Sequence, residues 1–276
     1  MTNKNKQKIL TLGPKYSYSY NVTYKKYNNK YEIICENQIE NVFEKVSKNK
    51  NLIGIVPIEN LINGNVRESF LALKKYKVKI NKAYDFNIKH CLASQTKEFK
   101  EITSHPQAIA QSSEFLKTYR KNNINISTCN STSKAMKIAK ENQNYAGIGS
   151  ELAAKEIGLK ILATNIGNIE NNITRFIEIS QTETIPENSS NIKTSLIIEP
   201  KIDRSGLLFE ILSIFKIKDI NLTKIESIPN GKKIGEYIFY IDIDASLNKT
   251  KVQEAINFLK TIVNIHLFGS YKIEKI

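Results

Sequence analysis

Tryptophan is absent from this chain of 276 residues, and cysteine and arginine are scarce. The three cysteines, Cys35, Cys91 and Cys129, are odd in number and far apart, so they indicate no disulfide framework and offer no CxxC pair for zinc. We expect free thiols that are buried or partly buried. His90 lies beside Cys91, but neighbouring residues of a strand point to opposite faces, so we expect no metal site there.

Long hydrophobic runs are also missing. No apolar stretch approaches the roughly 20 residues that a membrane-spanning helix needs. The first residues, MTNKNKQKILTLGPKYS, are basic, but their apolar part is too short for a signal peptide and has no small-residue cleavage site. We therefore expect a cytoplasmic protein that has no membrane partner.

Charge of one sign dominates, with 41 Lys and Arg against 27 Asp and Glu and a formal net charge of +14. Such an excess can indicate nucleic acid binding. However, only four of the basic residues are arginines, the side chain that reads bases and phosphates best. We expect a solvated lysine-rich surface without a nucleic-acid partner, which would also favour an anionic substrate.

Strand and helix patterns alternate through the first two thirds of the chain. Residues 8–13 and 51–58 read as buried strands, and Ile39, Val42, Phe43 and Val46 recur between them at helical spacing. A second unit of the same kind starts near residue 83 and closes with a strand at 174–180. This alternation predicts parallel sheets covered by helices.

The pattern changes after a polar segment, 181–191, which reads as a linker. Strands and helices then follow in the order β-α-β-β-α-β, which is ferredoxin-like. The predicted strands are 193–200, 221–229, 235–244 and 263–273, and the predicted helices are 205–217 and 248–261.

Polar residues follow several predicted strands, where ligands bind in open α/β sheets. The segments are 17–19, 59–60, 105–107 and 174–175. Each alone is weak, because an exposed turn, a helix entry or a solvated edge explains it equally well. Gly147 and Gly149 lack the third glycine of a dinucleotide-binding motif, since position 152 is Leu, and they indicate a tight turn.

Taken together and in order, these segments resemble the prephenate dehydratase family. LGPKYSYS is similar to its opening LGPxGTFS, and TSHPQAIAQ is similar to SHPQALAQ. GIVPIENLINGNVRESF resembles GVVPIENSxEGxVxxT, and the segment from STSKAMKIA to NNITRFIEI follows the family pattern that ends in NxTRF. The tail, KTSLIIEPKIDRSGLLFEILSIFKIKDINLTKIESIP, resembles the regulatory ACT domain of the family.

The resemblance implies a two-lobed catalytic domain of the type 2 periplasmic-binding-protein-like fold at 1–182. Lobe one would comprise about 1–80 and 160–180, and lobe two about 81–159. A linker at 183–192 and a ferredoxin-like ACT domain at 193–276 would follow. Family enzymes convert prephenate to phenylpyruvate, CO2 and water in phenylalanine biosynthesis, and they use no metal or cofactor.

The roles that the resemblance implies fit the chemistry of the side chains. The fork of Arg175 could bind a substrate carboxylate, and the hydroxyl of Thr174 could donate to the leaving oxygen. Glu59 is the expected general acid, provided that burial raises its pKa. Asn60 and Gln107 would orient the substrate. The remaining expected contacts are Ser17, Ser19, Phe176 and His105, of which His105 could donate a proton but has more often a structural role.

The tail would bind L-phenylalanine between two chains, so we expect a homodimer or homotetramer and feedback inhibition. The expected binding segments are Ser205, Gly206, Leu207 and Leu208, and Glu226, Ser227, Ile228 and Pro229. Two residues depart from the family pattern: Leu207 replaces Ala, and Ile228 replaces Arg. A tail that only holds the oligomer together is the alternative. In the catalytic part, Tyr16 replaces Gly and Leu61 replaces Ser.

Other functions remain open. Arogenate dehydratase performs the same chemistry on an analogue that has an ammonium in place of a keto oxygen, and no residue decides between the two substrates. An amino-acid-binding transport or sensor protein could share the fold, but the TRF motif favours an enzyme.

Overall fold

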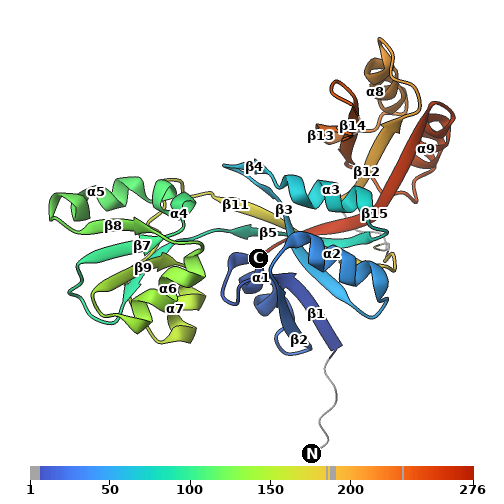
Figure 1. Ribbon diagram of the computed structural model, residues 1–276. Coiled ribbons are helices and arrows are strands. Elements are labelled where there is room, and N and C mark those ends of the chain that lie inside the picture. Colours follow the sequence, from blue (N-terminus) through green and yellow to red (C-terminus); the bar gives the residue numbers. More distant parts are fainter. Residues whose placement is uncertain (1–6, 185, 187–190, 232) are drawn as a thin grey trace, which may run out of the picture.

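A computed structural model of the chain describes residues 7–184, 186, 191–231 and 233–276. Two sheets organise it, one of ten strands and one of five. Figure 1 shows lobe two at one end, lobe one in the middle and the C-terminal domain at the other end. Within the described residues, no helix is long and apolar enough to cross a membrane.

Lobe one is built on the strand order β5-β11-β3-β1-β2, in which β1 runs parallel to β2 and β3, and β11 runs antiparallel to β3 and β5. The helix predicted from the spacing of apolar residues is confirmed as α2, whose buried face packs against this sheet. The elements are β1 (Gln7–Leu12), α1 (Tyr18–Tyr27), β2 (Tyr31–Glu36), α2 (Ile39–Lys48), β3 (Ile53–Asn60), β4 (Gly64–Asn65), α3 (Arg67–Lys75), β5 (Lys79–Asn87) and β11 (Ile173–Ser180).

Lobe two has the five-stranded sheet, in the order β10-β6-β9-β7-β8, with a hydrophobic cluster on each face. Gly147 packs against helix α6, since a Cβ there would lie 2.8 Å from the Ala135 carbonyl oxygen. The elements are β6 (Cys91–Ser94), β7 (Glu101–Ser104), α4 (Pro106–Gln111), α5 (Ser113–Lys121), β8 (Asn125–Thr128), α6 (Thr132–Glu141), β9 (Tyr145–Gly149), α7 (Glu151–Ile157) and β10 (Lys160–Ala163).

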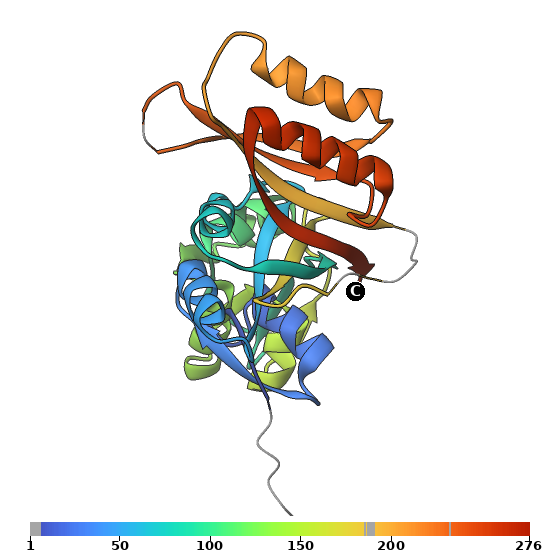
Figure 2. The same cartoon turned by 90° about the vertical axis from the view of Figure 1, so that its right-hand side faces the viewer.

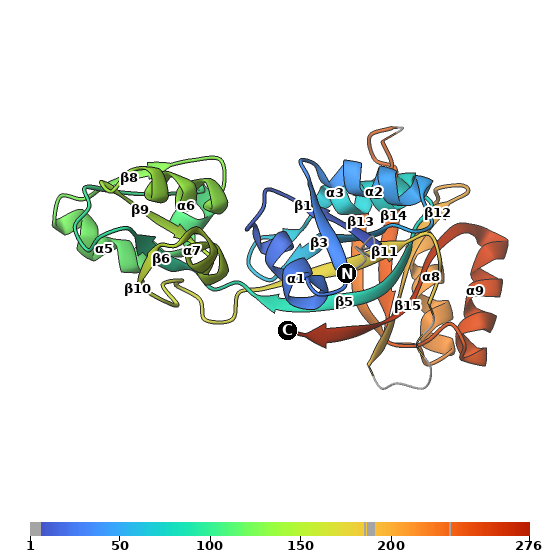
Figure 3. The ribbon, with the colours of Figure 1, turned by 90° about the horizontal axis from the view of Figure 1, so that it is seen from below.

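The boundary between the lobes differs from the expected one at both ends. Strand β5 continues to Asn87 within lobe one, because it pairs with β11 along its length. Strand β10, expected in lobe one, pairs antiparallel with β6 in lobe two. The chain therefore leaves lobe one after β5 and returns to it at β11 (Figure 3). The two segments that connect the lobes are hydrogen-bonded to each other, since the Ile88 N–H donates to the Asn172 carbonyl at 2.7 Å.

The C-terminal domain has the predicted β-α-β-β-α-β order, and its strands lie in the order β13-β14-β12-β15. Helices α8 and α9 cover the face that is turned away from lobe one (Figure 2). Of the expected linker 183–192, residues 185 and 187–190 lie outside the described part. The elements are β12 (Ile192–Pro200), α8 (Leu207–Ile217), β13 (Leu222–Pro229), β14 (Tyr237–Ile243), α9 (Thr250–Ile262) and β15 (Val263–Lys275).

The C-terminal domain is joined to lobe one in two ways. The end of β15 pairs in parallel with β5, so one sheet runs through both. The other face of the C-terminal sheet, including Ile197, Ile228 and Tyr240, shares a hydrophobic core with Phe43 and Phe70 of lobe one. Burial of these side chains, at roughly 1.5–3 kcal/mol each, holds the domain against the lobe.

Candidate active site

A cavity of about 200 Å³ lies between the two lobes, where β3 and β11 of lobe one face α4 and α6 of lobe two. An adjoining cavity of about 240 Å³ shares His90, Gln107, Gln111 and Asn172 with it, so the two form one interlobe cleft. Six of the residues expected in the site line the first cavity: Ser19, Asn60, His105, Gln107, Thr174 and Phe176. The structure therefore brings residues from distant parts of the chain together at one cavity.

Thr174 and Asn60 are directly opposite each other in the β11–β3 ladder. The amide Nδ2 of Asn60 donates to the Thr174 Oγ1 at 2.8 Å, which leaves the hydrogen of this hydroxyl free to point into the cavity. Asn60 is fixed in turn, because its Oδ1 accepts from the backbone N–H groups of Ile62 and Asn63 at 3.1 and 2.9 Å. The side-chain pair is thus pre-oriented toward the cavity.

A hydrogen-bonded chain that sequence reasoning missed extends this pair. Asn60 Nδ2 also donates to Asn172 Oδ1 at 2.8 Å, and Asn172 Nδ2 donates to Gln111 Oε1 at 3.1 Å. The same Gln111 oxygen lies 2.9 Å from His90 Nε2, while Tyr18 Oη lies 2.7 Å from His90 Nδ1. Asn172 could have been found, because it is two residues before Thr174 and so shares its strand face.

Burial determines the protonation of this chain. It lowers the pKa of His90, although the hydrogen bond to Gln111 acts in the opposite direction. Burial likewise raises the pKa of Tyr18 well above its ordinary value. The neutral ring then donates from Nε2 to the Gln111 oxygen and has its lone pair at Nδ1 toward the Tyr18 hydroxyl, whose one hydrogen lies between Nδ1 and the Lys89 carbonyl oxygen at 2.9 Å. The Gln111 Nε2 is buried without a hydrogen-bond partner among the described residues.

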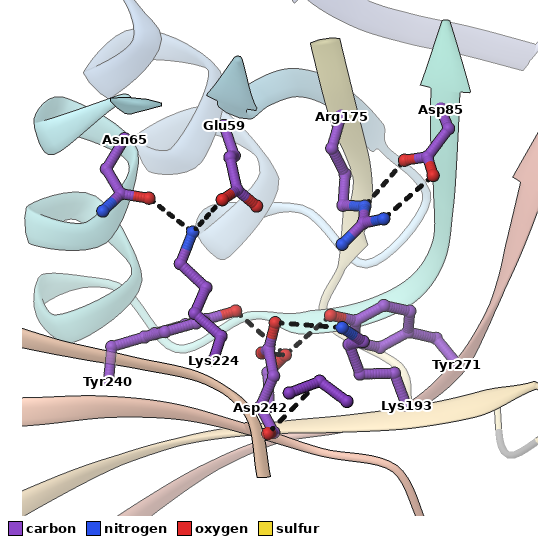
Figure 4. Close-up of polar contacts among 11 residues, drawn as sticks. Glu59, Asn65, Asp85, Arg175, Lys193, Lys224, Tyr240, Asp242 and Tyr271 are labelled. Atoms are coloured by element: carbon purple, nitrogen blue, oxygen red, sulfur yellow. Dashed lines mark hydrogen bonds and ion pairs between the residues drawn. The ribbon is translucent and has the colours of Figure 1, made fainter. Parts of the chain in front are cut away.

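Glu59 and Arg175 are not in the cavity, so the expected roles of general acid and carboxylate clamp are wrong in this structure. They form the cross-strand pair next to Asn60 and Thr174 in the β3–β11 ladder. Because successive residues of a strand point to opposite faces, Glu59 and Arg175 point away from the cavity. Figure 4 shows both turned toward the C-terminal domain. Arg175 binds Asp85 with two hydrogen bonds, Nε to Oδ1 at 2.7 Å and a terminal nitrogen to Oδ2 at 2.9 Å.

The Arg175–Asp85 pair is a structural contact between β11 and β5. Burial alone would lower the pKa of Arg175, but the hydrogen bonds and the charge of Asp85 outweigh it and raise that pKa above its ordinary value. Ser17, another expected substrate contact, caps helix α1: its Oγ accepts from the Tyr20 N–H at 3.2 Å and donates to the Leu12 carbonyl at 3.0 Å.

His105 both caps a helix and lines the cavity. Its Nδ1 accepts from the Gln107 N–H at 3.3 Å and so caps helix α4, which begins at Pro106 as predicted. The ring also lines the cavity. The two catalytic-domain residues that differ from the family pattern, Tyr16 and Leu61, do not line the cavity. Tyr16 adopts a φ of 74°, in the region that suits the glycine of the family pattern. The Leu61 side chain is exposed, at 66%.

Two residues of the expected phenylalanine segments, Leu207 and Ile228, lie on opposite faces of the C-terminal sheet. Leu207 is buried in the core beneath helices α8 and α9, whereas Ile228 is buried in the core on the side of lobe one, which also includes Phe70 and Tyr240. Within one chain, these two side chains therefore do not meet in a common site.

The comparisons with known proteins identify the family of the chain. The prephenate dehydratase family model matches residues 9–184, and the chain belongs to this family. It is 39% identical over 278 residues to a prephenate dehydratase of Methanocaldococcus jannaschii, with 98% of this chain and 99% of that protein covered. It is 30% identical to arogenate dehydratase/prephenate dehydratase 2 of Arabidopsis thaliana, with 99% of this chain and 75% of that protein covered.

A solved structure resembles the whole chain. The crystal structure of a prephenate dehydratase from Arthrobacter aurescens in complex with L-Phe has a TM-score of 0.86 and 28% sequence identity, and the match covers 96% of this chain and 90% of that one. The two-lobed architecture and the C-terminal domain are thus common to both proteins.

Proposed function

We propose that this protein removes CO2 and hydroxide from prephenate to give phenylpyruvate, with the reaction in the interlobe cavity. The C–C bond to the ring carboxylate breaks, its electron pair enters the ring, and the C–O bond breaks as hydroxide leaves. The free hydrogen of the Thr174 hydroxyl, oriented by Asn60, would donate to the leaving oxygen. This pre-oriented pair is the observation that carries the proposal.

The leaving hydroxide needs a proton, and among the described cavity residues only Tyr18, His90 and His105 can titrate. Burial keeps the first two in their neutral forms. Because Nδ1 of His105 accepts from the Gln107 N–H, the ring in this geometry is neutral and its hydrogen is on Nε2, which would donate a hydrogen bond to the leaving oxygen. The proton that converts hydroxide to water would come from solvent, and Glu59 has no part in this step.

Substrate binding would depend on backbone groups. The described lining of the cavity holds no lysine or arginine, yet prephenate carries two carboxylates. Residues at the N-terminal ends of α1 and α6, Ser19 and Thr132, line the cavity, and helix N-termini bind anions through their free N–H groups. Gln107 would complete the contacts by a neutral hydrogen bond.

Arogenate is the second candidate substrate, because the Arabidopsis relative is named for both activities. Its ammonium would need a carboxylate or several acceptors nearby. The described lining of these two adjoining cavities contains no Asp or Glu, which favours prephenate. Initial rates on the two substrates test this choice, with phenylpyruvate from prephenate read by its absorbance in alkali and phenylalanine from arogenate read by chromatography. Faster turnover of arogenate would reverse the choice, and turnover of neither would refute the proposal.

The C-terminal domain would bind L-phenylalanine as an inhibitor, in an assembly of two or four copies. The crystal structure from Arthrobacter aurescens in complex with L-Phe supports this role. Because Leu207 and Ile228 lie in separate cores, a ligand that touches both of these side chains would need to contact two chains. Phenylalanine titrated against the initial rate tests the proposal, and an unchanged rate at millimolar concentration would leave the domain as a scaffold only.

A further inference from the structure

Lys224 of the C-terminal domain reaches into lobe one. It lies on β13, at one edge of the ten-stranded sheet, and its Nζ is 2.8 Å from Glu59 Oε1. The same Nζ donates to Asn65 Oδ1 and lies 5.5 Å from the ring centre of Phe70. Only 12% of the Lys224 side chain is exposed. Figure 4 shows the ammonium between Glu59 and Asn65.

The two partners of Lys224 belong to one hairpin. Strand β4 pairs with β3 so that Asn65 is opposite Glu59, and Gly64 is opposite Asn60. One ammonium therefore bridges both strands of the hairpin that carries Asn60. Because Glu59 and Asn60 are neighbours in β3, any shift of the Glu59 backbone also shifts the amide that orients Thr174.

The ion pair differs from an ordinary surface pair. Exposed lysine–carboxylate pairs contribute little, because water and salt screen them. Lys224 is instead largely buried, has two oxygen partners and lies against an aromatic ring, and this set of contacts fixes the position of the ammonium. The Arg175–Asp85 pair fixes the opposite strand, β11, to β5 in the same layer.

We propose that Lys224 is a positioning residue for the reaction: through Glu59 it holds the Asn60 amide in line with the Thr174 hydroxyl. The inference rests on the proposed function. Strand β13 also carries Glu226, which follows Lys224 by two residues and so shares its face. A ligand that displaces β13 would therefore loosen the hairpin and lower turnover.

Steady-state kinetics with prephenate test the proposal. Lys224→Met keeps the length and the packing on Phe70 but removes the charge, and we expect kcat to fall by about 10-fold, with KM changed by less than about twofold. Lys224→Arg restores the charge and should recover most of kcat. The double variant Lys224→Met/Glu59→Gln should be no slower than Glu59→Gln alone, since both remove the same contact.

Lys218→Met is the matched control, because it breaks an ion pair with Glu254 inside the same domain, and its kcat should stay unchanged. Hydrogen exchange provides a readout that does not depend on substrate: the Leu61 and Val66 amides, which bond to Ile173 and Ile58, should exchange faster in Lys224→Met. An unchanged kcat or additive losses in the double variant would overturn the positioning role. Faster exchange in a protein that does not turn over prephenate would refute the proposed function but not the contact.

Discussion

The substitution Asn60→Asp separates the donor role of this side chain from its structural role. A carboxylate keeps the oxygen that accepts from the backbone N–H groups of Ile62 and Asn63. It removes the amide that donates to Thr174 and Asn172, both at 2.8 Å, and it puts a negative charge beside an anionic substrate. The variant should therefore fold but lose turnover.

Two terms determine the expected size of the loss. Removal of a donor that acts in the transition state costs about 3 kcal/mol. A new charge roughly 6 Å from a substrate carboxylate costs about 3 kcal/mol at an effective dielectric constant of about 20. Together these predict that kcat/KM falls by on the order of 10⁴-fold. The loss should shrink at low pH, since burial among oxygens raises the pKa of the new carboxyl group and its neutral form can donate.

The assay is the initial rate of phenylpyruvate formation, with circular dichroism to confirm folding. Asn125→Asp is the control: it adds the same charge at the exposed start of β8 and should leave the rate unchanged. A value of kcat/KM for Asn60→Asp within about threefold of the unmodified protein would refute the donor role, because one lost hydrogen bond in the transition state already costs more.

Three further predictions concern the same framework. Arg175→Lys should destabilise the fold by about 1–3 kcal/mol in urea unfolding, because the fork to Asp85 is lost, with KM for prephenate unchanged; a large rise in KM would restore Arg175 as a substrate ligand. In the folded protein the pKa of His90 lies below its ordinary value of 6.5, so the folded state binds a proton less readily than the unfolded chain and stability should fall as pH drops below about 6.5. In His90→Gln the slope of unfolding free energy against pH should therefore be shallower. An equal slope would contradict the lowered pKa. Gly54→Ala should lower the melting temperature, since a Cβ would lie 2.6 Å from Val42 Cγ1 and overpacking costs about 1–3 kcal/mol; an unchanged melting temperature would show that the core can relax.

Element order was predictable from periodicity, because buried faces leave regular apolar spacing. The spacing of Ile39, Val42, Phe43 and Val46 predicted α2, and the C-terminal order of strands and helices was confirmed. The limits of the lobes were not predictable. Strand β10 pairs with β6 rather than with a strand of lobe one. This choice depends on contacts between residues far apart in the chain, which local periodicity does not predict.

The site was predictable to the level of segments. Motif order brought Asn60, Thr174 and Gln107 into one cavity. The error came at single residues: Glu59 and Arg175 are charged neighbours of cavity residues, and charge suggested catalysis although strand alternation sends them to the other face. The alternation rule, applied to the TRF motif, would have placed Thr174 and Phe176 together and Arg175 opposite. The sequence raised His90 only in connection with a metal site, because its side-chain partners, Tyr18 and Gln111, come from two segments that are distant in sequence.

The role of the Thr174 hydroxyl is tested most directly by the rate of phenylpyruvate formation from prephenate in Thr174→Val and Thr174→Ser. Valine has nearly the same shape without the hydroxyl, and serine keeps it. We expect Thr174→Val to lose on the order of 10³-fold in kcat, whereas Thr174→Ser should stay within about tenfold of the unmodified protein. Undiminished turnover by Thr174→Val would contradict the mechanism.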